Sequence, residues 1–151
     1  MTSERTRVLT LLDELQAAER AGAMALGEWA ASCRDPALRG GLRVIQARGR
    51  RHAALAEQRL RALGGTPAAA VGRALAALCE VIGDPGIADR SKLAMLLARA
   101  PAAGRPPLGA ALARLTGDAE TRALFVSIDE DEQASLGWLR SIQDLLEREG
   151  T

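Results

Sequence analysis

The chain has 151 residues, which fits one domain spanning residues 1–151 with enough length to bury a hydrophobic core. Its formal net charge is +1, so no bulk field favours binding to nucleic acid or to an anionic membrane. With one Phe, no Tyr and two Trp, the aromatic enrichment typical of β-strands is missing, and the composition predicts an all-α fold.

The N-terminal sequence MTSERTRVLTLL has no long apolar stretch after a basic start, so we expect no signal peptide. No apolar run approaches the roughly 20 residues that are needed to span a bilayer. We therefore expect a cytoplasmic protein without membrane contacts. Cys33 and Cys79 lie in apolar stretches and are expected to be small buried side chains rather than a disulfide framework.

Capping signals define the first two helices. The first helix is predicted over residues 4–32, with Thr2 or Ser3 as its N-cap. The pair 35–36 (Asp-Pro) supplies an N-cap followed by proline at the first helical position, and it predicts a second helix over residues 36–63. Two glycines then end this helix.

The third segment is predicted to be an interrupted helix. Its expected pieces are 67–82, 87–100 and a short stretch around Leu108, Leu112 and Leu115, with breaks at 83–86 and at 101–107 (PAAGRPP). A last helix is predicted over residues 118–149. Short connections between long helices favour antiparallel neighbours, so the pattern predicts an antiparallel four-helix bundle whose third helix is interrupted.

Polar residues interrupt the apolar stripes of three of these helices. Apolar positions spaced by three and four residues predict which face of each helix is buried. Glu19 lies in the stripe of the first helix, Gly49 and His52 in that of the second, and Glu132 and Ser135 in that of the last. Antiparallel packing puts these positions at about the same height. Buried carboxylates and imidazoles need a partner or a metal ion, so the pattern indicates a present or former site.

This layout resembles the ferritin-like superfamily, in particular its rubrerythrin-like and uncharacterised bacterial members. The similar strings are LDELQAAERAGAMALGEWA around Glu19, RRHAALAEQRLRALGG around His52 and FVSIDEDEQASLGWLR around Glu132. The resemblance implies a di-iron centre to which the first and third helices each supply one Glu. It also implies a Glu-x-x-His pair from the second and the fourth helix.

Only half of the expected ligands are present. Glu19, His52 and Glu132 match, but Gly49 stands where the second helix should supply Glu and Ser135 where the last helix should supply His. On the third helix no acid lies at the expected height, because Glu80 and Asp89 fall elsewhere. The di-iron site is therefore degenerate, and the three remaining donors could hold at best a single, weakly bound iron, manganese or zinc ion.

Two interpretations of these residues remain open. In the first, the site has decayed, and an arginine from the run Arg48, Arg50 and Arg51 pairs with Glu19 or Glu132. In the second, Glu19, His52 and Glu132 form a residual metal site, with Asp129 or water as a further ligand.

The function that the resemblance implies is correspondingly reduced. We expect a non-ferroxidase binding or assembly module, acting as a homodimer; the alternative is an iron- or manganese-dependent oxidoreductase. No catalytic or cofactor-binding residue is predicted apart from the metal ligands. The break at 101–107 is either a plain connector or an entrance to the site, over a pocket lined by Leu97, Leu108 and His52. Met24 and Met95 are expected in the core, and Trp29 and Trp138 as packing anchors.

Overall fold

The computed structural model describes residues 3–99 and 108–150, with the side chain of Leu108 excepted. Over these residues the chain is helical, and no strand occurs among them, so the all-α prediction is confirmed. The described helices are α1 (Glu4–Ser32), α2 (Pro36–Ala62), α3 (Arg73–Gly83), α4 (Asp89–Ala98), α5 (Leu108–Ala113) and α6 (Ala119–Glu149). None of these helices is both long enough and apolar enough to cross a membrane.

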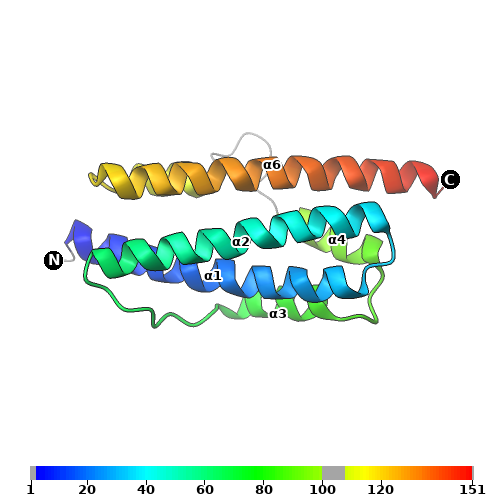
Figure 1. Cartoon of the computed structure of the whole chain (residues 1–151), viewed down its shortest axis with the longest axis horizontal. Coiled ribbons are helices and arrows are strands. Elements are labelled where there is room, and N and C mark those ends of the chain that lie inside the picture. The colour runs from blue at the N-terminus through cyan, green and yellow to red at the C-terminus, as the bar shows by residue number, and fades with distance from the viewer. Residues whose placement is uncertain (1–2, 100–107, 151) are drawn as a thin grey trace.

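A capping side chain begins each of the three long helices, and the caps of the first two are the predicted ones. The hydroxyl of Ser3 accepts the backbone N–H of Thr6 and starts α1. Asp35 accepts the N–H of Leu38 at 2.9 Å, and Pro36 follows it, so α2 starts where the sequence predicts. The carboxylate of Asp118 caps α6 in the same way. The three long helices, α1, α2 and α6, lie side by side along the longest axis of the molecule (Figure 1).

The prediction for the start of the third segment is wrong. The helix expected from residue 67 begins at Arg73, because the backbone N–H groups of Ala68 and Ala69 donate to the carboxylate of Asp13 on α1, at 3.1 Å to Oδ1. These hydrogen bonds satisfy the backbone in a non-helical conformation, which helix formation would have to replace. The residues between α2 and α3 are thereby fastened to α1.

The predicted pieces of the third helix also do not share one helix axis. Helix α3 packs on α1 and runs in the same direction, ending with Gly83 beside Glu28. The chain then turns, and α4 runs back and packs on α6 (Figure 1). Helix α5 continues along α6, with Gly109 against Asp129. The predicted break at 101–107 lies outside the described residues.

Apolar side chains gather at the two ends of the molecule. One cluster surrounds Trp29 near the α1–α2 turn, and the other surrounds Leu12 and Phe125 at the opposite end. Trp29 is fully buried and Trp138 packs against its cluster, so both predictions of packing anchors are confirmed. The prediction for the methionines is wrong, because the exposed fraction is 64% for Met24 and 42% for Met95.

Asp89 fastens the start of α4 to the end of α1. Its Oδ1 accepts the indole N–H of Trp29 at 3.0 Å, and its Oδ2 accepts the backbone N–H of Arg34 at 3.1 Å. The thiol of Cys33 lies 3.6 Å from the same Oδ2. Burial raises the pKa of this thiol to about 11, so Cys33 is the inert buried side chain that the sequence predicts. Cys79 is half-buried.

Lys92 is the single lysine of the chain, and its exposed fraction is 1%. Its ammonium lies 5.8 Å from the centre of the Trp29 ring and has no ion pair with any described residue. Burial lowers the pKa of Lys92, against the opposing effect of Asp89. A cation–π contact of this kind offsets only part of the cost of burying a charge.

Lys92→Met is therefore expected to leave stability unchanged or to raise it by about 1 kcal/mol, because a thioether chain of similar length fills the same space without a charge. The native pKa of Lys92 is below its unfolded value, so the wild-type chain gains stability as the pH rises towards 10.5 and the variant does not. Urea unfolding of both proteins at neutral and alkaline pH measures this difference. A loss of several kcal/mol in Lys92→Met at neutral pH would contradict it.

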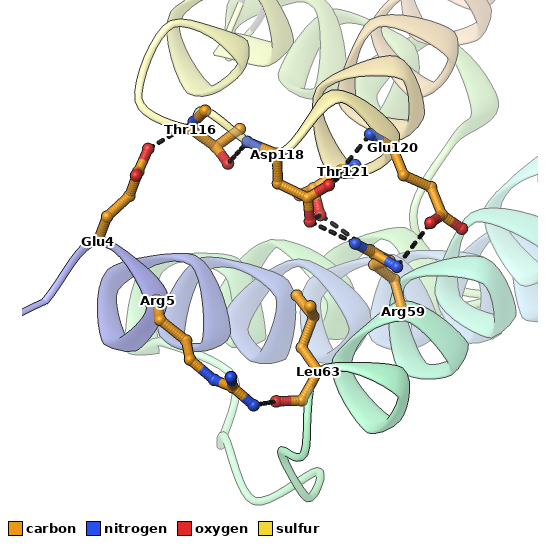
Figure 2. Close-up of polar contacts among 9 residues, drawn as sticks. Glu4, Arg5, Arg59, Leu63, Thr116, Asp118, Glu120 and Thr121 are labelled. Carbon is orange, nitrogen blue, oxygen red and sulfur yellow. Dashed lines mark hydrogen bonds and ion pairs between the residues drawn. The ribbon is translucent and has the colours of Figure 1, made fainter.

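Polar contacts join α1, α2 and α6 at the end of the molecule far from the α1–α2 turn (Figure 2). The guanidinium of Arg59 contacts Asp118, donates to Thr121 Oγ1 at 2.9 Å and lies 2.8 Å from a carboxylate oxygen of Glu120. Glu4 accepts the backbone N–H of Gly117 at 2.5 Å. Hydrogen bonds from Thr121 and Arg59 lower the pKa of Asp118 to about 2.

Arg59→Met is expected to destabilise the chain by about 1–3 kcal/mol, because it removes charge-assisted hydrogen bonds to the capping carboxylate of α6. The native pKa of Asp118 is depressed, so this contribution is present above its unfolded value of 3.8 and disappears as the pH falls through about 2. The matched control is Arg61→Met. The side chain of Arg61 is exposed, and its one ion pair among the described residues, with Glu57, is long at 3.9 Å, so its loss should cost little. Equal stabilities of the two variants at pH 7 would contradict the prediction.

Candidate metal centre

Three side chains from three helices meet between the two apolar clusters. Glu19 comes from α1, His52 from α2 and Glu132 from α6, and each offers one donor atom that lies within 4.8 Å of the other two. The three predicted metal ligands are thus brought together. Imidazole nitrogen and carboxylate oxygen are the donors that zinc, iron and manganese use in proteins, and this group could hold a metal ion.

His52 is held in place by a carboxylate on each side. Its Nε2 lies 2.7 Å from Asp131 Oδ2, and its Nδ1 lies 3.6 Å from Glu19 Oε2. A carboxylate accepts, so Nε2 donates to Asp131 and leaves Nδ1 facing the donor group. Burial lowers the pKa of His52, but Glu19 and Asp131 outweigh burial and raise the pKa. An imidazole whose second nitrogen is fixed by a carboxylate is the usual arrangement at protein metal sites.

The surroundings of Glu132 favour the protonated form of its carboxyl group. Burial, followed by the neighbouring Glu19, raises the pKa of Glu132 to about 9. Without a cation, two carboxylates this close together cannot both stay ionised, and one keeps its proton. A divalent cation between them would remove that repulsion and release the proton. The electrostatics of the donor set therefore fit a bound cation.

The prediction of an arginine in the site is wrong for the described residues. Arg48 reaches across to α6, but its Nη1 donates to Ser135 Oγ at 2.9 Å. No described arginine forms an ion pair with Glu19 or Glu132. The guanidinium of Arg48 is thus bonded to the neutral hydroxyl of Ser135 and not to a carboxylate of the donor group.

Gly49 leaves little room where the resemblance implies a second-helix carboxylate. A Cβ on Gly49 would lie 3.2 Å from Ala23 Cβ and 3.6 Å from Glu19 Oε2. The backbones of α1 and α2 thus approach closely beside the site. This close approach explains the glycine by packing, and it leaves three donors in place of six.

Asp131 is the site residue that sequence reasoning missed. Within the acidic run at 129–132, the sequence pattern predicts only Glu132, and Asp129 as a possible further ligand, to belong to the site. Asp129 does point inward, and its Oδ1 is buried with no hydrogen-bond partner in the described part of the chain, but it does not belong to the donor group. The spacing of three and four residues that joins Ile128 to Ser135 also passes through Asp131, and this signal could have found it.

A cavity of about 310 Å³ extends from the donor group. Its polar lining comes from Glu19, His52, Glu132, Ser135 and Arg99. Its apolar lining comes from Ala23, Leu26, Ile45, Leu96, Leu136 and Leu139, with Gly22 and Gly49 in the wall. The predicted pocket thus exists beside His52, but Leu96 takes the place expected for Leu97, and the side chain of Leu108 lies outside the described structure.

Comparison of the chain with the profiles of known protein families, with characterised proteins and with solved structures finds no match. The functional argument therefore depends on the site itself.

Proposed function

We propose that the protein is a ferritin-like four-helix bundle that binds a single iron, manganese or zinc ion and acts as a binding or assembly module, not as a ferroxidase. The observation that carries this proposal is the convergence of Glu19, His52 and Glu132 from three helices onto one point. We further propose that it acts in the cytoplasm as a homodimer, a state that analytical ultracentrifugation of the metal-loaded protein would test.

The order of the helices supports the fold assignment. Helices α1 and α2 form an antiparallel pair, and the long connection that carries α3 crosses back along α1 before α4 begins. Helices α4 and α5 then run antiparallel to α6. Two antiparallel helix pairs joined by one long crossover are the arrangement of ferritin-like bundles. In this assignment α4 and α5 together take the place of the third helix.

The donor set supports one metal ion rather than two. Gly49 and Ser135 supply no ligand of the kind a second iron needs, and no acidic side chain of α4 or α5 joins the donor group. Three protein donors leave coordination positions for water or a small ligand. Oxidation of paired iron ions, as in ferritins, needs bridging carboxylates and a terminal ligand on each iron, which is more than the three donors that the described residues bring together.

Metal analysis of the purified, untagged protein tests the proposal. We expect about one metal ion per chain after growth in medium supplemented with iron, manganese and zinc, and none in His52→Ala. The matched control is Gln58→Ala, an exposed residue on the same helix, which should keep the metal. Absence of metal from the wild-type protein, also after dialysis against each ion, would contradict the proposal.

The second candidate function is a metal-dependent oxidoreductase. The cavity of about 310 Å³ that opens on the donor group favours it, because a substrate could lie beside the metal. Oxygen consumption by the iron(II)-loaded protein, compared with that of His52→Ala, measures this activity. Equal rates of oxygen consumption in the two proteins would contradict the oxidoreductase function and leave metal binding as the only function proposed.

A further inference from the structure

We propose that the metal-free protein binds a primary alkylammonium ion, with its charged head between Glu19, His52 and Glu132 and its unbranched apolar chain in the adjoining cavity. This ligand goes beyond the metal ion of the proposed function and does not need it, because the ammonium group takes the place that the metal would occupy. Three features of the site favour such an ion: the spacing of the donor atoms, the charge around them and the apolar wall that continues from them.

The three donor atoms are spaced for hydrogen bonds to one small group. Because each lies within 4.8 Å of the other two, an atom placed midway between them lies no more than about 2.8 Å from each, which is hydrogen-bond distance. A primary ammonium group has three N–H donors. Glu19 and Glu132 each offer a carboxyl oxygen, and His52, which donates from Nε2 to Asp131, offers Nδ1. Three donors thus meet three acceptors, one from each of α1, α2 and α6.

Negative charge at the donor group has no arginine or lysine partner. No described residue of either type forms an ion pair with Glu19 or Glu132. When Glu132 keeps its proton, Glu19 is still a carboxylate, and Asp131 lies 2.7 Å from the imidazole of His52. Negative charge therefore remains even beside a protonated imidazole. Arg99 also lines the cavity, but it is exposed, and water and salt screen its charge. The head group that fits is a cation.

An apolar wall continues from the donors along the molecule. Leu26, Ile45 and Leu139 line it, and each lies seven residues from one of the three donors on the same helix. Seven residues make about two helical turns, so these side chains lie on the same helix faces as the donors and about 10 Å further along. All three pack in the cluster around Trp29, so the cavity runs towards the α1–α2 turn.

The size of the cavity fits a short alkyl chain. A volume of about 310 Å³ is at the lower end of the range of about 300–1,000 Å³ that is typical of small-molecule sites. Gly22 lies in the cavity wall between Glu19 and Leu26, and a Cβ placed on it would meet no atom within 4 Å. The space beside the donors is therefore open without the movement of any side chain.

Calorimetric titration of the chelator-treated full chain with octylamine, which is charged at neutral pH, tests the inference. Octanol lacks the charge, octyltrimethylammonium keeps the charge but has no N–H donor, and methylamine lacks the chain. We expect octylamine to bind at least about tenfold more tightly than each of these probes. Equal or tighter binding of octanol or octyltrimethylammonium would overturn the assignment of the head group, and equal binding of methylamine would overturn that of the chain.

Zinc and octylamine should compete for the donors. We expect protein that holds zinc to bind octylamine at least about tenfold more weakly than the chelator-treated protein, and Glu19→Gln to weaken octylamine binding to the metal-free protein by a similar factor. The matched control is Glu14→Gln, at an exposed position of α1, where binding should match wild type. Unchanged octylamine binding in Glu19→Gln, or in protein shown to hold zinc, would overturn the proposed position of the ammonium group.

Gly22→Leu fills the cavity and is expected to abolish octylamine binding while zinc binding stays, because the three donors are unchanged. The matched control is Gly137→Leu, on the exposed face of α6, where a Cβ also meets no atom within 4 Å and where binding should match wild type. Circular dichroism and thermal unfolding check that both variants fold. Octylamine binding by Gly22→Leu at the wild-type affinity would overturn the cavity assignment. A wild-type protein that binds zinc but not octylamine overturns this inference alone, and the reverse result overturns the metal proposal alone.

Discussion

Glu132→Gln is expected to abolish stabilisation by metal ions while leaving the metal-free protein folded. The amide has the shape of the protonated acid that burial and Glu19 favour at this position, but it lacks the charge that a cation needs. A ligand at a concentration of 100 times its Kd stabilises the folded state by about 2.7 kcal/mol. Thermal unfolding with and without zinc or manganese should show this gain in the wild-type protein and none in the variant.

The pH dependence of the metal-free proteins provides a second readout. The pKa of Glu132 is raised to about 9 in the folded chain from an ordinary value of 4.5, so the folded state binds more protons between these values. Its contribution to stability is therefore complete below pH 4.5 and is lost as the pH rises to about 9. Glu132→Gln removes this loss and should be the more stable protein at pH 9.

The matched control for Glu132→Gln is Glu130→Gln, on the same helix with an exposed side chain. This control should respond to metal and to pH as the wild-type chain does. Retained stabilisation of Glu132→Gln by zinc or manganese would contradict the assignment of Glu132 as a ligand. Equal pH profiles of Glu132→Gln and wild type would contradict the electrostatic account of the site.

Asp89→Ala is expected to cost about 3 kcal/mol of stability, the largest loss that we predict for a single polar side chain. The substitution leaves the buried indole N–H of Trp29 and the backbone N–H of Arg34 without their acceptor. An unsatisfied buried donor costs about 1–3 kcal/mol. The native pKa of Asp89 is lowered, because these hydrogen bonds outweigh burial, so its contribution is present above the ordinary value of 3.8 and is lost on acidification.

A double-mutant cycle separates the hydrogen bond to Trp29 from the rest of this loss. Trp29→Phe keeps the ring in the core and removes the donor, so the two substitutions together should cost less than the sum of their separate costs. Asp144→Ala, at an exposed position of α6, is the control and should change stability by less than about 0.5 kcal/mol. Additive effects of Trp29→Phe and Asp89→Ala, or a loss in Asp89→Ala no larger than in the control, would contradict the prediction.

The long helices and the three donors were predictable because they depend on local rules. Caps at Ser3, Asp35 and Asp118 fix where helices begin, and the spacing of apolar residues fixes which face is buried. Antiparallel packing of the helices is then enough to place Glu19, His52 and Glu132 at about the same height. These parts of the fold and of the site follow from short stretches of sequence.

The parts that could not be predicted depend on contacts between distant residues. Nothing near residue 67 reveals that Asp13 accepts the backbone N–H groups of Ala68 and Ala69 and prevents helix there. The direction of Arg48 depends on a hydroxyl on another helix. The exposure of Met24 depends on which faces of α1 the neighbouring helices leave uncovered. Helical periodicity gives a buried face but does not say how many neighbours cover it.

The three residues of the donor group are separated by very different lengths of chain. Glu19 and His52 meet through the short turn between α1 and α2, whereas Glu132 arrives only after α3, α4 and α5 have been placed. Closing the longer loop carries the larger entropic cost, so contacts across α1 and α2 should form early in folding and those with α6 late. Interactions that form after the rate-limiting step slow unfolding rather than speed folding. A cation held by all three side chains would therefore lengthen the lifetime of the folded chain more than it shortens the time the chain takes to fold.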